Sequence, residues 1–182
     1  LDAGIASGAD SLEATLQAAF EAGVVEDIVV AKNGAEADSL WRIRHSVSEA
    51  QKFEGVSLKH DVSVPIGDIG TFLERCENEL KSQLAGIRPV VFGHVGDGNL
   101  HYNVSQPIGM DPDRFAEEGR KITTAIYDLV TAMGGSISAE HGIGVLKKEQ
   151  LLRYRSSEEV ALMRTLKKAL DPANTLNPGK VI

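Results

Sequence analysis

The clearest chemical feature of this chain is a pair of histidines on either side of a short turn sequence. His94 and His101 lie in the segment from Gly93 to Asn103, which has Asp-Gly at its centre. Asp-Gly between apolar runs is typical of a two-residue β-hairpin turn. A turn centred there places the two histidines directly opposite each other, with Cβ atoms roughly 5 Å apart. The spacing therefore predicts that both imidazoles bind one metal ion, and strand alternation places Asn103 on the same face.

A second cluster places a carboxylate beside a histidine at the end of a predicted strand. It is the sequence from Ser138 to Gly142, with Glu140 and His141 at its centre. Two histidines and one glutamate form an N,N,O ligand set typical of an open zinc, manganese or iron site. If Glu140 completes the hairpin site, His141 is left free beside it. We expect it to act as a proton acceptor, because an imidazole has a pKa close to neutral.

Basic residues supply candidates for anion binding. Arg44 and Ser48 are spaced i, i+4 on a predicted helix, so a guanidinium and a hydroxyl could face the same anion. The alternative is a solvated surface pair. Lys59 shares one face of a predicted strand with Asp61, and its alternative is a local Lys–Asp pair.

These residues need a framework, and the sequence predicts alternating helices and strands. The His hairpin makes at least part of the sheet antiparallel. We therefore expect an α+β fold, with an open, partly antiparallel sheet covered by helices, a ferredoxin-like core and a helical C-terminal segment at 146–182. The predicted helices are 11–22, 36–53, 68–84 and 112–133, with two more after Lys147, and the predicted strands are 27–31, 56–64, the hairpin and 136–139.

Composition limits the classes of function. The chain has 182 residues and a formal net charge of -7, which argues against nucleic-acid binding. No apolar run approaches the length of a membrane span. The single cysteine, Cys76, cannot form an internal disulfide and fits a cytoplasmic setting. Because the chain begins at Leu1 and enters soluble sequence at once, we expect residues 1–182 to be a single domain of a longer polypeptide.

Taken together, the motifs resemble the C-terminal, substrate-binding domain of FAD-linked oxidases in the D-2-hydroxyglutarate, D-lactate and glycolate oxidase group. The similarity covers nearly the whole chain, and its five ordered motifs are specific in combination. They are Trp41 to Arg44, Lys59 to Pro65, Gly93 to Asn103, Ser138 to Gly142, and Leu170 to Pro172 with Asn177 to Lys180.

The resemblance implies a role for each matching site residue. It implies that the hairpin histidines and the Glu-His-Gly glutamate are metal ligands, and that the next histidine takes the substrate's hydroxyl proton. Ser48 stands where the 2-hydroxyglutarate enzymes tend to have threonine, and His60 replaces a tyrosine. The implied roles are: metal ligands His94, His101 and Glu140; base His141; substrate-binding residues Arg44, Lys59 and Asn103, with Ser48; and a flavin-facing residue, Asn177.

The resemblance also implies a reaction and its cofactors. The expected reaction is oxidation of a D-2-hydroxy acid to a 2-oxo acid, with hydride passing to FAD. The FAD would be held mainly by an N-terminal domain absent from this chain, so the isolated chain is expected to be inactive. For the divalent metal, zinc is favoured over manganese or iron. Expected partners are the small 2-hydroxy acid, the FAD domain and an unidentified electron acceptor, with a homodimer left open.

Two other classes of function remain alternatives. The first is a free-standing zinc hydrolase, in which the same three ligands hold the metal and His141 or Asp97 activates water. The second is a non-enzymatic carboxylate-binding module, for which binding of 2-hydroxy acids would survive a chelator.

Overall fold

The computed structural model describes residues 6–182, and the chain divides into two compact units, Leu1–Gly55 and Val56–Ile182. The first unit is helical, with α1 (Ala6–Glu21), α2 (Gly34–Ala50) and a short 3-10 helix, η1 (Gln51–Glu54). The backbone N–H of Glu36 donates to the side chain of Asn33, at 3.0 Å, which caps the start of α2 as the Asn-Gly sequence indicates.

One predicted element of the first unit is wrong. Residues 27–31 form no strand, and Val29 keeps 72% of its surface exposed. A strand is stable only where a neighbour accepts and donates its ladder hydrogen bonds, and the described part of this unit contains no other strand. The apolar run therefore remains an irregular connection between α1 and α2.

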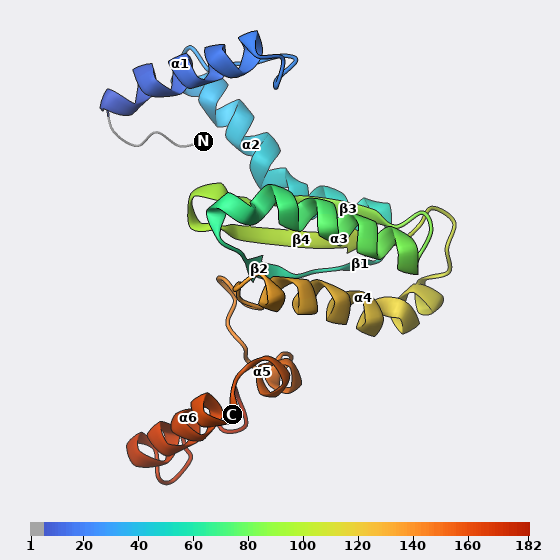
Figure 1. Ribbon diagram of the computed structural model, residues 1–182, viewed down its shortest axis with the longest axis vertical. Helices are drawn as coiled ribbons and strands as arrows, with labels where there is room; N and C mark the ends of the chain where they lie inside the picture. Colours follow the sequence, from blue (N-terminus) through green and yellow to red (C-terminus); the bar gives the residue numbers. More distant parts are fainter. Residues whose placement is uncertain (1–5) are drawn as a thin grey trace. The chain divides into compact units, whose positions relative to one another are not determined.

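The second unit is built on an antiparallel sheet with β4 at its centre (Figure 1). One neighbour, β3, pairs along one side of β4, and β1 and β2 pair along the other. The elements in chain order are β1 (Ser57–Leu58), β2 (Asp61–Ser63), η2 (Ile66–Asp68), α3 (Ile69–Gln83), β3 (Arg88–His94), η3 (Val95–Asp97), β4 (Asn99–Ser105) and α4 (Pro112–Ala132).

The edge of the sheet beyond β2 is completed by a single bridge. Ser63 and Ser136 exchange two backbone hydrogen bonds of 2.9 Å, so the segment after α4 lies beside β2, where one more strand would run. The predicted strand 136–139 is reduced to this bridge because the chain then bends at residues 137 and 139–141. With β1 and β2 counted as one interrupted strand and the bridge at Ser136 as the last strand, the order is β-α-β-β-α-β. This order is ferredoxin-like, which confirms the predicted α+β class.

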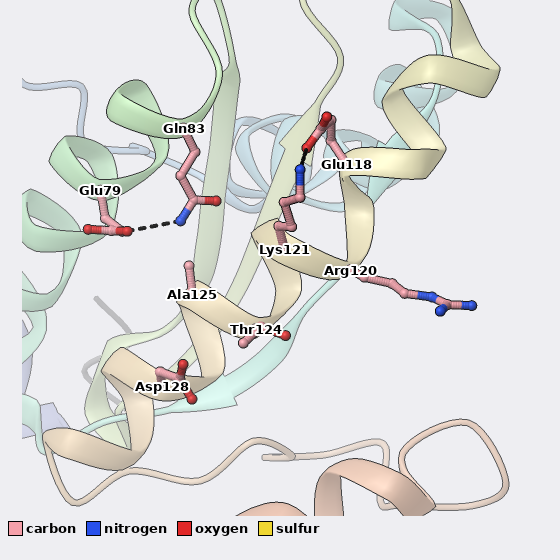
Figure 2. Close-up of a pocket in the computed structure, with 8 residues that line it drawn as sticks. All are labelled: Glu79, Gln83, Glu118, Arg120, Lys121, Thr124, Ala125 and Asp128. Atoms are coloured by element: carbon pink, nitrogen blue, oxygen red, sulfur yellow. Dashed lines mark hydrogen bonds and ion pairs between the residues drawn. The ribbon is translucent and has the colours of Figure 1, made fainter.

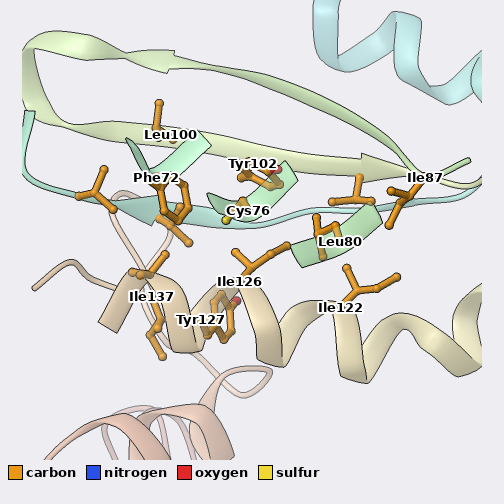
Figure 3. Close-up of a cluster of buried hydrophobic side chains, with 14 of the residues drawn as sticks. Phe72, Cys76, Leu80, Ile87, Leu100, Tyr102, Ile122, Ile126, Tyr127 and Ile137 are labelled. Carbon is orange, nitrogen blue, oxygen red and sulfur yellow. The ribbon is translucent and has the colours of Figure 1, made fainter. Parts of the chain in front are cut away.

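The two sides of the sheet have different chemistry because side chains alternate along β4. Its even-numbered residues pack with α3 and α4 in one apolar core (Figure 3). Burial there raises the pKa of the Cys76 thiol to about 12, so this cysteine packs as a small apolar group. The main core residues are Val62, Phe72, Cys76, Leu80, Leu100, Tyr102, Val104, Phe115, Ile122, Ile126 and Val130.

The odd-numbered residues of β4 lie on the opposite face of the sheet. Asn99, His101 and Asn103 are on this face, and the antiparallel register adds Asp61 opposite His101. These four polar side chains lie on one face of a sheet whose other face is apolar. We call this side the polar face, and it is the candidate site.

A shallow hollow between α3 and α4 lies on the helical side of the unit (Figure 2). Two hydrogen bonds of 2.9 Å join residues of its lining, from Gln83 to Glu79 and from Lys121 to Glu118. This hollow contains none of the candidate site residues that the sequence indicates.

The chain continues into α5 (Lys148–Tyr154) and α6 (Ser157–Leu170), as the sequence predicts. Ser156 and Glu159 form a capping box at the start of α6. The following tail is not helical. The backbone N–H of Val181 donates to Gly144 at 2.7 Å and the Lys148 amine donates to Gly179 at 3.0 Å, so the tail folds back on the segment before α5. No helix within residues 6–182 has the length and apolarity to cross a membrane.

Candidate metal and substrate site

The hairpin that carries the two histidines has a different register from the predicted one. Its loop has four residues, Val95 to Gly98, closed by a hydrogen bond of 3.1 Å from the Gly98 N–H to the Val95 carbonyl. Only Gly98 adopts a positive φ, of 67°. His94 therefore lies opposite Asn99, and His101 lies opposite Phe92. The predicted direct His94–His101 pairing is wrong, but a shift of two residues leaves both histidines on the polar face.

Close packing around the hairpin explains two of its glycines. A Cβ on Gly93 would lie 2.1 Å from the carbonyl oxygen of Asn99. A Cβ on Gly98 would lie 2.1 Å from the carbonyl oxygen of Val64, and the Val64 N–H donates to the Gly98 carbonyl at 3.0 Å. These positions have no room for a side chain, so the glycines allow the hairpin to lie against the end of β2.

Glu140 lies beside both predicted histidine ligands. Its carboxylate oxygens are 3.6 Å from Nε2 of His94 and 3.8 Å from Nε2 of His101. Two ligands each about 2.1 Å from a tetrahedral zinc ion lie about 3.4 Å apart, which is close to both separations. The donor types and spacings around Glu140 therefore fit a divalent metal. Asn99 also donates its side-chain amide to this carboxylate.

Asp61 holds the turn that carries Glu140 and His141. Its buried carboxylate accepts the backbone N–H groups of Ala139, Glu140 and His141 at 2.9 to 3.0 Å. Burial alone would raise the pKa of Asp61, but these hydrogen bonds and the nearby positive charge outweigh it and hold the pKa below its ordinary value. Asp61 is therefore a carboxylate inside a cradle of backbone donors, a form of anion site that loops commonly provide.

Lys147 supplies the positive charge on the inner side of this turn. Its amine donates to the carbonyl of Ile137 at 2.9 Å and lies 4.0 Å from the Asp61 carboxylate. Burial lowers the pKa of Lys147, and the attraction of Asp61 partly offsets this effect. The lysine that approaches the Asp61 carboxylate is thus Lys147, from a distant segment, and not the neighbouring Lys59 of the alternative interpretation.

A group of three potential ligands also forms around His101. The ligand atoms of Asp61, His101 and His141 all lie within 4.8 Å of one another. The Oδ2 atom of Asp61 already accepts three backbone hydrogen bonds and one hydroxyl from the turn, which leaves this oxygen little capacity for a metal. The rings of His101 and His141 stack with centroids 5.8 Å apart, so the second histidine lies directly beside the first.

Lys59 and Asn103 are brought together by the strand register. Leu58 lies opposite Val104 and Asp61 lies opposite His101, so the same register runs past the interruption between β1 and β2. Lys59 is thereby opposite Asn103 on the polar face. Arg44 and Ser48 lie on α2 in the first unit, and Asn177 lies in the C-terminal tail with a φ of 48°.

Comparison with known proteins identifies the family. The family model for FAD linked oxidases, C-terminal domain, matches residues 4–181. The chain belongs to this family. The resemblance inferred from the five motifs is therefore confirmed.

The relatives of this FAD-linked oxidase domain share a substrate in their names. A D-2-hydroxyglutarate dehydrogenase from Xanthomonas citri pv. viticola is 41% identical over 97% of this chain and 38% of its own length. The mitochondrial D-2-hydroxyglutarate dehydrogenase of Arabidopsis thaliana is 39% identical over 95% of this chain and 30% of its own length. A D-2-hydroxyglutarate–pyruvate transhydrogenase of Saccharomyces cerevisiae is 33% identical, over 95% and 35%. The chain thus spans about a third of the length of these proteins.

Sequence reasoning missed three residues that shape the site of this FAD-linked oxidase domain. Asn99 bonds Glu140, Asp61 holds the turn from Ala139 to His141, and Lys147 ties that turn to β2. Asn99 and Asp61 stood inside quoted motifs, so their place in those motifs was an available signal. Nothing in the sequence linked Lys147 to a carboxylate 86 residues away.

Proposed function

We propose that this chain is the substrate- and metal-binding part of a flavin-dependent D-2-hydroxyacid dehydrogenase. The observation that carries the proposal is the position of the Glu140 carboxylate, which lies within 4 Å of both hairpin histidines on the polar face of the sheet. Membership of the FAD-linked oxidase family supports the redox reaction. The names of the relatives favour D-2-hydroxyglutarate over D-lactate or glycolate as the substrate.

The metal in this proposal is held by His94, His101 and Glu140, with zinc favoured over manganese or iron. When bound, it supplies positive charge that favours the ionised form of the substrate's hydroxyl. Asp61 is not assigned as a ligand, because its Oδ2 accepts three backbone hydrogen bonds from the turn beside it.

His141 is the proposed base for the hydroxyl proton. Its Nδ1 lies 3.9 Å from Asp61, so Nε2 is the ring nitrogen assigned to take the proton. The side chain is 65% exposed, which leaves it accessible to a substrate. A neutral imidazole beside a cationic site is suited to remove a proton as the hydride leaves the α-carbon.

Charged and polar residues are proposed to orient the acid. Lys59 and Asn103, adjacent on the polar face, bind carboxylate and hydroxyl oxygens, and Arg44 and Ser48 of α2 remain assigned to substrate carboxylate. A guanidinium can bind a carboxylate through two parallel hydrogen bonds, which sets orientation as well as affinity.

The flavin completes the proposed reaction. When bound, FAD supplies the two-electron acceptor for the α-hydrogen. It is proposed to lie mainly on a separate N-terminal FAD domain of the whole protein, with Asn177 facing it, and the electron acceptor is not assigned. A cytoplasmic location is proposed from the unpaired Cys76, although relatives from plants and animals are named mitochondrial.

A spectrum of the full-length gene product tests this function. We expect a flavin absorption band that bleaches on anaerobic addition of D-2-hydroxyglutarate, with D-lactate and glycolate as comparisons. The L-enantiomer is the matched control and should leave the band unchanged. A colourless product that cannot be reconstituted with FAD would overturn the proposal. Metal-dependent hydrolysis without flavin would instead favour the hydrolase, and acid binding that survives a chelator would favour the binding module.

A further inference from the structure

The turn that carries Glu140 and His141 has almost no regular structure of its own. It contains neither helix nor strand, and its side chains are exposed at residues 139–141. Such a segment samples many conformations unless other groups hold its backbone. Metal binding and proton transfer both require side chains fixed to within a fraction of an ångström. The structure must therefore hold this turn from outside.

The Asp61 carboxylate is the group that holds it. It accepts three consecutive backbone N–H groups, from Ala139 at 3.0 Å, Glu140 at 3.0 Å and His141 at 2.9 Å, and a hydroxyl of Ser138 at 3.3 Å. Asp61 is itself immobile, because it lies in β2 opposite His101 and keeps only 3% of its surface exposed. A hydrogen bond to an ionised carboxylate is about twice as strong as a neutral one.

The same carboxylate connects the turn to the sheet strand that carries a predicted metal ligand. Asp61 and His101 are direct partners across β2 and β4, while the turn it holds supplies Glu140, 3.8 Å from Nε2 of His101. One buried side chain therefore determines the spacing between a ligand on the sheet and a ligand on an irregular segment. The Lys147 amine lies 4.0 Å from this carboxylate and balances its charge. The amine is held there by hydrogen bonds to the backbone carbonyls of Ile137 and Asp61.

We infer that Asp61 is a positioning residue for both Glu140 and His141. It contacts neither substrate nor metal, and it acts by holding the backbone of the turn in place. The assignment to catalysis rests on the proposed function, whereas the assignment to the geometry of the turn does not. It also explains why Asp61 lies near two histidines without being assigned as their fellow ligand.

The test compares Asp61→Asn with Asp111→Asn in the full-length protein. The asparagine at position 61 has the same shape and can place its carbonyl oxygen where Oδ2 lies, but it lacks the negative charge, and its NH2 group then faces the Glu140 N–H from the Oδ1 position. Asp111 is the matched control, since its carboxylate also accepts two backbone N–H groups, from Asp113 and Arg114, at the start of α4. Asparagine is itself a good N-cap, so the control should behave as wild type.

The first measurement is amide hydrogen exchange in metal-free protein. In Asp61→Asn we expect exchange at residues 139–141 to be at least about tenfold faster, because the hydrogen bond of each amide loses its ionised acceptor. Exchange at Ile126 and Val130 of α4 should not change. Unchanged exchange at 139–141 would overturn the inference, and so would an equal acceleration in α4, which would mean a general loss of stability.

The second measurement is zinc affinity by competition with a chelator, with kcat and KM recorded in parallel. Loss of an outer partner of a metal ligand typically lowers affinity about 10- to 100-fold, which is the expected range for Asp61→Asn. We expect kcat to fall with little change in KM, because the base and the metal ligand move while Lys59 and Asn103 do not. Wild-type zinc affinity in the variant would contradict the inference even if the flavin reaction is confirmed.

A second variant applies if Asp61→Asn does not fold. Ser138→Ala removes a hydroxyl that bonds the Asp61 carboxylate at 3.3 Å and the Gly142 carbonyl at 2.9 Å, and it leaves the three backbone donors to Asp61. We expect a smaller rise in exchange, confined to residues 138–141, and a smaller fall in zinc affinity. Because neither exchange nor zinc binding needs flavin or acid, a failure of the proposed reaction would remain distinguishable from a failure of this inference.

Discussion

Asn99 donates its side-chain amide to the carboxylate of Glu140 from the position directly opposite His94 in the hairpin. Because a carboxylate accepts only, this bond determines which end of the amide faces Glu140. The other end, Oδ1, is buried and accepts no hydrogen bond within the described residues. Asn99 therefore holds one oxygen of a proposed metal ligand, while its own buried oxygen has no hydrogen-bond donor among the described residues.

The Asn99 contact predicts an effect on metal binding. Asn99→Ala should weaken zinc binding about 10- to 100-fold, because Glu140 loses the partner that orients it. Asn103→Ala is the matched control on the same face of the same strand, and it should raise KM for the hydroxy acid while leaving zinc affinity unchanged. Competition titration with a chelator measures both affinities. Equal zinc affinities of Asn99→Ala and wild type would exclude this role.

The assignment of the hairpin histidine as a ligand has a direct test. His101→Ala should abolish stoichiometric zinc or manganese binding, since an open site with three protein ligands loses one of them. His45→Ala removes a histidine that stacks on Trp41 in the first unit, and it should retain the metal. Elemental analysis of the purified proteins gives the answer. Full metal content in His101→Ala would refute the hairpin assignment.

His60 predicts how the fold responds to acid. Burial lowers its pKa from 6.5 to about 4, with the charge of Lys147 adding to the effect and a hydrogen bond to the Tyr102 carbonyl opposing it. The neutral ring donates from Nδ1 to that carbonyl, so Nε2 accepts from the hydroxyl of Thr123. The folded state thus takes up the proton less readily than the unfolded chain.

The stability contributed by neutral His60 is complete above pH 6.5 and is lost as the pH falls toward 4. The loss amounts to about 3 kcal/mol of unfolding free energy. Urea denaturation at a series of pH values measures it. His60→Gln cannot titrate, so its unfolding free energy should change less over this interval. Parallel pH profiles for the two proteins would be evidence against a buried neutral ring.

Gly98 predicts a local effect on stability. Its φ of 67° and the carbonyl of Val64, 2.1 Å from where a Cβ would lie, both oppose a side chain. Gly98→Ala should therefore lower the unfolding free energy by more than about 3 kcal/mol. Gly109 has a φ of 76° and open space around it. Gly109→Ala should cost only the backbone strain, about 1 to 2 kcal/mol. Thermal denaturation of both variants compares these terms, and equal losses would mean that the contact with Val64 is unimportant.

Local pattern was enough for most of the helices and for the faces of the sheet. Periodic apolar residues and caps such as Asn33 and Asp111 act within a few residues, so they can be recognised from short sequence. The alternation along β4 also put His101 and Asn103 on one face correctly. The strand predicted at 27–31 failed because its partner had to come from elsewhere.

The hairpin register separates what the sequence by itself determined from what the tertiary structure decided. Asp-Gly predicted a turn at the correct place, but it could not distinguish a two-residue loop from the four-residue loop that forms. Only one residue there adopts a positive φ, and Gly98 then packs against Val64. Because the shift is two residues, His94 and His101 kept the same face and exchanged the partner opposite them.

The site itself was decided by contacts between distant segments. The sequence by itself determined the chemical groups: two histidines, a glutamate, a neighbouring histidine and the strand that carries Asp61. Tertiary structure decided their spacing, because Asp61 bonds a turn 77 to 80 residues away. Such contacts depend on how α4 and the sheet pack, and a hydrogen bond over that separation has no local signature in sequence.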